Sequence, residues 1–80
     1  MQFEGYEIHV SDRKDKKYYA IVDGKKVHFG AKGYEHFHDK LGHYSSSDHN
    51  DITRRDAYHK RHKVDYPKGS ADWFAKKILW

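Results

Sequence analysis

Hydrophobic and polar residues alternate near the start of the chain, with the period of a half-buried β-strand. Within residues 2–10, Tyr6, Ile8 and Val10 fall on one face, and polar side chains lie between them. A charged turn, Ser11–Lys17, follows this segment. The pattern predicts a first strand over residues 2–10.

A second apolar segment leads into Asp23-Gly24, and a third follows directly. Asp-Gly between two such segments predicts a hairpin with a two-residue loop, because both central residues of a type I′ turn need positive φ. This loop pairs Tyr18 with Phe29 and places them on one mostly apolar face. We expect the helices to pack on that face.

The second half of the chain predicts two helices. Asp48 is the expected N-cap of a helix from residue 52 to about 63, and Ser70 that of a last helix from 71 to about 80. Residues 34–41 could add one or two helical turns. Together the elements predict an α+β fold, with a three-stranded antiparallel sheet packed on one face by two C-terminal helices.

Residues 1–80 should form a single small domain, with the sheet in residues 1–30, a loop-rich segment at 31–49 and the helices in 50–80. Leucine occurs only at Leu41 and Leu79, so the 16% of aromatic residues must supply much of the core. Each large aromatic side chain can bury roughly 150–250 Å², which makes a compact core feasible.

The charge and the cysteine content narrow the classes of protein to which this chain can belong. The 16 Lys and Arg residues outnumber the 12 Asp and Glu residues, giving a net charge of +4, and eight histidines add charge in mild acid. Cysteine is absent, which excludes disulfides and thiolate metal sites. No apolar run approaches the ~20 residues of a membrane span, and no signal-peptide core is present. We expect a soluble protein without a cofactor.

Basic residues cluster in the first predicted helix and offer a candidate binding surface. Such cations neutralise phosphates, and nearby aromatic rings stack on bases. The same pattern is typical of a solvated helix face, and a net charge of +4 does not separate these interpretations. The candidate partner-binding residues are Arg54, Lys60, Arg61 and Lys63, with Lys25, Lys26, Lys32 and Trp80.

Histidine spacings allow two further interpretations. His36-x-His38 and His59-x-x-His62 are spaced like zinc or nickel ligands. Histidines at i and i+3 on one helix side more often pack in a half-buried position, so we assign no metal site. A small metal-dependent nuclease stays open as the alternative enzyme, using His28, His49, His59 or His62.

Four motifs, in order, resemble those of a known family. They are Phe-Gly-Ala-Lys-Gly-Tyr at residues 29–34, His-x-Asp at 49–51, Arg-x-x-Tyr-x-x-Arg-His at 55–62, and a final Leu-Trp. They make residues 17–80 similar to an uncharacterised family of small basic proteins that large DNA viruses, phages and aquatic metagenomes encode. The resemblance implies a viral or phage setting, in the host cell cytoplasm or the virion, and implies no activity.

We therefore expect a non-enzymatic viral or phage accessory protein that works by binding. Its partner would be nucleic acid or a protein complex that handles nucleic acid. A virion structural component is a further alternative. Neither a membrane nor a small-molecule substrate is expected as a partner.

Overall fold

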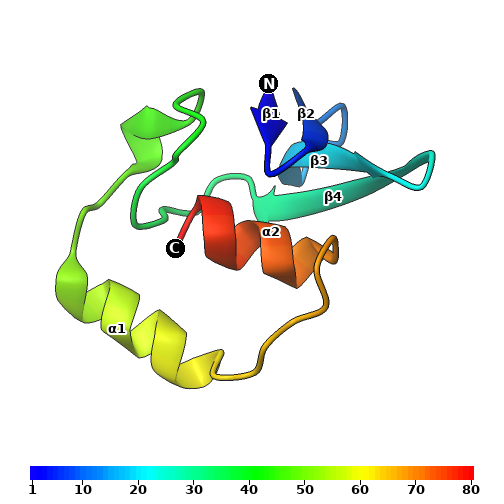
Figure 1. Ribbon diagram of the computed structural model, residues 1–80. Coiled ribbons are helices and arrows are strands. Elements are labelled where there is room, and N and C mark those ends of the chain that lie inside the picture. Colours follow the sequence, from blue (N-terminus) through cyan, green and yellow to red (C-terminus); the bar gives the residue numbers. More distant parts are fainter.

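The computed structural model describes residues 1–80 and shows an antiparallel sheet with two helices (Figure 1). The α+β class predicted from the sequence is confirmed. The sheet contains four strands in chain order, where the sequence pattern predicted three. The elements are β1 (Gln2–Phe3), β2 (Tyr6–Val10), β3 (Lys16–Val22), β4 (Lys25–Ala31), a 3₁₀ turn at Ser45–Ser47, α1 (Ile52–Arg61) and α2 (Ala71–Ile78).

The additional strand arises because a tight turn divides residues 2–10. Glu4 and Gly5 have φ angles of 48° and 85°, and Phe3 pairs with Tyr6 across this two-residue loop. Positive φ at a glutamate is uncommon, so the residue type gave no turn signal. The hydrophobic alternation continues through the turn, which made two strands resemble one.

The hairpin between β3 and β4 forms as predicted. Asp23 and Gly24 have φ angles of 51° and 77°, and Tyr18 pairs with Phe29. Because side chains on a strand alternate between faces, this register puts the buried aromatic side chains of both strands on the same side of the sheet.

The hydrophobic core lies between this face of the sheet and α2, and Figure 1 shows α2 beside β4. Phe74 is fully buried and stacks on Phe29, with ring centroids 5.2 Å apart. Ser70 caps α2 as predicted, since its side chain accepts a hydrogen bond from the Trp73 N–H. The buried apolar residues are Ile8, Tyr18, Ala20, Phe29, Trp73, Phe74, Ile78 and Leu79.

The first helix does not pack on the sheet, which corrects the prediction that both helices would. No residue of α1 is buried, and Figure 1 shows α1 standing apart from the strands. Its inward side carries Arg55, Tyr58 and His59, whose polar atoms cannot enter a dry core. These side chains instead contact Trp80, whose ring is parallel to that of Tyr58 at 4.4 Å.

Residues 34–41 contain no helix, contrary to the sequence-based expectation. An isolated parallel bridge joins His36 to Asp48, so this segment lies beside the chain that leads into α1. Asp51, and not Asp48, caps α1, because its carboxylate accepts the N–H groups of Thr53 and Arg54. Neither helix has the length and apolar character needed to cross a membrane.

Candidate functional site

A row of buried polar side chains joins the sheet to the loop before α1. Lys17 on β3 is 2% exposed, and its Nζ donates to the backbone oxygen of Tyr34 and to Nδ1 of His36, both at 2.7 Å. His36, 1% exposed, therefore carries its proton on Nε2 and donates to Asp48 Oδ1 at 2.5 Å. The row Lys17–His36–Asp48 leads from the start of β3 to the loop before α1.

Two aspartates hold the loop in this position. The carboxylate of Asp39 accepts the backbone N–H groups of Leu41 and Tyr44 and the hydroxyl of Tyr18. Asp48 accepts the N–H of Asp39 at 2.8 Å in addition to the histidine proton. This polar loop thus folds with little regular secondary structure because carboxylates satisfy several of its backbone donors.

The environment changes the proton affinities of these groups. Burial, with the Lys17 cation alongside, lowers the pKa of His36, and burial also lowers the pKa of Lys17. Burial disfavours the Asp48 carboxylate, but the Asp39 N–H and His36 donate to it and lower its pKa overall. Burial and the Asp39 carboxylate raise the pKa of Tyr18. At neutral pH this row therefore holds a neutral His36 beside an ionised Asp48.

Lys17 and His36 lie at the wall of a pocket of about 380 Å³ between the end of β4, the loop and α1. This size falls in the range of small-ligand sites, and we call it the α1 pocket. Its cations are Lys17, Arg54 and Arg61, and its only acid is Glu35, which pairs with Arg54 at 3.0 Å. The remaining lining residues are Gly30, Ala31, Tyr34, His36, Tyr58, Ala75, Leu79 and Trp80.

The helical period explains why α1 presents its basic side chains to this pocket. Arg54, Tyr58 and Arg61 are separated by four and three residues, so they share one face of α1, and all three line the pocket. The guanidinium of Arg61 has no hydrogen-bond or ion-pair partner in the protein. Arg54 and Arg61, two of the four basic residues predicted to bind a partner in this part of the chain, therefore help to form one wall of a pocket.

Gly30 gives the pocket part of its shape. Its φ of 78° is left-handed, and a Cβ there would lie 3.0 Å from Leu79 Cδ1 and 3.2 Å from Lys17 Cβ. A side chain at residue 30 would therefore push Lys17 or Leu79 away. The first glycine of the Phe-Gly-Ala-Lys-Gly-Tyr motif therefore allows the side chains of Lys17 and Leu79 to lie close to the backbone of β4.

The other candidate binding residues are distributed over the molecule. Lys60 and Lys63 are exposed at and just beyond the end of α1, outside the pocket lining. Lys32 is exposed in the turn after β4. Lys25 and Lys26 lie at the tip of the β3–β4 hairpin, at the opposite end of the molecule from α1 in Figure 1. The structure thus brings Arg54, Arg61 and Trp80 together but leaves the hairpin lysines apart.

Of the four histidines of the nuclease alternative, His28 lies apart on the sheet, whereas the other three lie around the rings of Tyr58 and Trp80: His49, His59 and His62. His28 bonds to Ser11 at 2.8 Å on the sheet, while His59 donates to the backbone oxygen of Trp80 at 3.1 Å. His62 bonds to Tyr66 and stacks on Tyr58. No group of three or more His, Asp or Glu side chains is placed to hold a metal ion.

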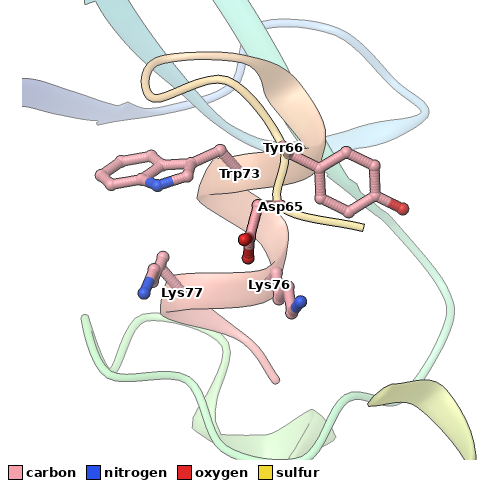
Figure 2. Close-up of a pocket in the computed structure, with 5 residues that line it drawn as sticks. All are labelled: Asp65, Tyr66, Trp73, Lys76 and Lys77. Carbon is pink, nitrogen blue, oxygen red and sulfur yellow. The ribbon is translucent and has the colours of Figure 1, made fainter. Parts of the chain in front are cut away.

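A second pocket, of about 270 Å³, opens beside α2. Figure 2 shows Asp65 between the rings of Trp73 and Tyr66, with Lys76 and Lys77 along the helix. Lys76 already donates to the backbone oxygen of His62 at 2.9 Å, and Asp65 balances part of the positive charge. This pocket has mixed charge and no buried ionic group in its lining, so the α1 pocket is the stronger candidate site.

The sequence patterns did not predict that Lys17 and His36 are buried in this site. Lys17 belongs to a run of charged residues that predicted an exposed turn, and its neighbour Tyr18 is the residue whose burial was expected. His36 was considered only as a ligand or a packed histidine. The available signal was the density of polar groups in residues 34–48, but their partners are set by contacts distant in sequence.

The molecule is thus a small α+β protein with a basic pocket beside an otherwise unburied helix. It belongs to a family of unknown function (DUF5754), whose profile matches residues 6–62. This confirms the expectation of an uncharacterised family. The match includes Lys17, His36, Arg54 and Arg61, whereas α2 and Trp80 follow it in the chain. No curated protein and no solved structure matches the chain significantly.

Proposed function

We propose that the protein binds nucleic acid without catalysing a reaction, using the pocket face of α1 and the lysines at its end. The observation that carries this proposal is the convergence of Lys17, Arg54 and Arg61 on one pocket whose only carboxylate is already paired. Cations gathered in this way attract phosphates. Tyr34, 72% exposed on the same pocket, offers a ring for a base to stack on.

The surrounding surface supports a chain-like ligand. Lys60 and Lys63 are exposed on either side of the pocket residue Arg61 in the sequence, and Lys32 is exposed directly after the pocket residue Ala31. A strand that enters the pocket can therefore continue along further cations. Single-stranded nucleic acid suits this arrangement better than a duplex, because its bases are free to stack on an exposed ring.

We further propose a viral or phage setting for this activity, as a host-cell or virion component. This part of the proposal rests on the motif resemblance alone. A protein complex that handles nucleic acid is the competing partner, and it would use the same cations against acidic side chains.

Binding of a fluorescent single-stranded decanucleotide, measured by anisotropy at low salt, tests the function. Replacing Arg54 and Arg61 together by Gln should weaken binding about tenfold or more, because two charge-assisted contacts are lost. The matched control replaces Lys14 and Lys68 by Gln, which removes the same charge from exposed side chains outside the pocket. Equal weakening by both pairs, or no binding by the wild type, would contradict the proposal.

The nuclease alternative is tested in the same preparation. Incubation of plasmid DNA with Mg²⁺, Mn²⁺, Zn²⁺ or Ni²⁺ should give no cleavage above that of a His59→Ala variant. Metal-dependent cleavage that disappears in His59→Ala and His62→Ala would replace binding by catalysis as the function.

A further inference from the structure

The buried ammonium group of Lys17 lacks both a third hydrogen-bond acceptor and a carboxylate ion-pair partner within the protein. An ammonium group has three N–H donors, and Lys17 uses two of them, on Tyr34 and His36. No carboxylate forms an ion pair with it, although its side chain is almost fully buried. A buried cation without a direct counter-ion is costly, and an anion from outside would remove much of that cost.

The positions around Lys17 define which anion fits. Arg61 lines the same pocket with a guanidinium that has no partner, and Arg54 is held by Glu35. Three cations around one concave site suit a compact group with more than one negative charge. A phosphate monoester carries between one and two charges at neutral pH and several acceptor oxygens, whereas an internal phosphodiester carries only one.

The pocket also has room for more than the phosphate. Its volume is about 380 Å³, and Tyr34 at its lining exposes an aromatic ring that no other aromatic side chain covers. Trp80 is less available for stacking, since Tyr58 lies against one of its faces and His49 lies close to its ring. A base on Tyr34 and a phosphate near Lys17 together describe a nucleotide.

We propose that the α1 pocket binds the terminal phosphate of a nucleotide unit, with Lys17 and Arg61 as the phosphate contacts and Tyr34 as the base platform. This inference deepens the proposed function and rests on it where the nucleotide is the end of a strand. The same chemistry is offered by a free mononucleotide, so the experiment separates the two sources.

The experiment measures the affinity of the full chain for decathymidylate with a 5′-phosphate, with a 3′-phosphate or with neither, and for AMP against adenosine. The phosphorylated member of at least one pair should bind roughly tenfold to hundredfold more tightly, the factor expected of hydrogen bonds to charged groups. Chemical shifts of the backbone amides of residues 17 and 61 should respond to AMP and not to adenosine, whereas the amide of residue 34 should respond to both at saturating concentration.

Two pocket variants and one control test where the preference for a phosphate arises. Arg61→Gln should abolish it without changing the fold, because the guanidinium has no partner to lose. Lys14→Gln, which removes a charge from an exposed side chain outside the pocket, should keep it. Lys17→Met should also abolish it. If Lys17→Met fails to fold, Arg61→Gln decides the outcome.

The possible results separate this inference from the function on which it rests. Decathymidylate binding that is indifferent to the terminal phosphates, with AMP equal to adenosine, overturns the phosphate pocket and leaves nucleic-acid binding intact. AMP binding without decathymidylate binding supports the pocket and removes the proposed function. A preference that survives in Arg61→Gln as it does in Lys14→Gln overturns the assignment to this pocket.

Discussion

At the scale of single residues, His36 shows how neighbours determine a protonation state. Lys17 donates to Nδ1 and Asp48 accepts from Nε2, so the ring is held in one tautomer. Burial and the Lys17 cation lower its pKa against the opposing effect of Asp48. The surroundings that hold this ring in place therefore also oppose its protonation.

Stability should consequently depend on pH through His36. Because its folded pKa lies below the unfolded value of ~6.5, the unfolded chain takes up the proton first. The contribution is fully present above pH ~6.5 and is lost as pH falls through that value towards the folded pKa. Denaturant melts between pH 8 and pH 5 should show this loss. The lowered pKa of Asp48 adds a further loss only below about pH 4.

The variant His36→Gln should be less stable at pH 8 but should show a flatter pH profile. His43→Gln, on an exposed side chain, should keep the wild-type profile. If His36→Gln and the wild type lose stability in parallel between pH 7 and pH 5, a different group is responsible.

At the scale of elements, α1 and α2 are held by different physical means. Helix α2 buries Trp73, Phe74 and Ile78 against the sheet, so its position is set by the hydrophobic effect. Helix α1 buries no residue and is held by ring stacking and by hydrogen bonds from Arg55 and His59 to the backbone of Trp80. We expect α1 to open more readily than α2.

Removing the Trp80 ring should release α1 selectively. Trp80→Ala deletes the stack on Tyr58, worth about 1 kcal/mol or more, and should speed amide exchange in residues 55–61 about fivefold to tenfold. Amides of α2 should change less. Val64→Ala, which shortens a side chain that is 65% exposed, is the control. Uniform acceleration in both helices would mean that Trp80 supports the core and not α1.

At the scale of the whole molecule, charge is divided between two ends. The hairpin tip with Lys25 and Lys26 lies at the opposite end of β4 from the pocket residues Gly30 and Ala31, in a molecule whose longest dimension is 36 Å. A short ligand centred on the pocket therefore uses only part of the net charge of +4. The hairpin lysines should matter only for longer strands.

The salt dependence of binding shows which of these two groups of cations contacts the ligand. Each phosphate neutralised on a single strand contributes about −0.7 to the log–log slope of affinity against salt. Replacing Arg54 and Arg61 by Gln should make the slope for a tetranucleotide shallower by roughly 1.4. Replacing Lys25 and Lys26 should leave it unchanged. A change in slope after the second replacement would place the ligand across the sheet.

The sequence by itself determined the local features whose causes lie within a few residues. The Asp23-Gly24 hairpin and the Ser70 cap formed as predicted, because turn geometry and capping depend on adjacent backbone. The basic face of α1 also follows directly from the helical period. The Glu4-Gly5 turn was missed because its first residue is unusual at positive φ.

Only the tertiary structure decided the pocket. Lys17 and His36 are separated by 19 residues, and Arg54 meets Glu35 across a similar separation, so no local pattern reports either contact. Whether a charged residue is buried or solvated depends on what folds over it, and here the loop of residues 34–48 and the C-terminal residues Leu79 and Trp80 cover the end of the sheet. Buried polar groups need hydrogen-bond partners because water is excluded, and the tertiary fold determines which groups lie close enough to be those partners.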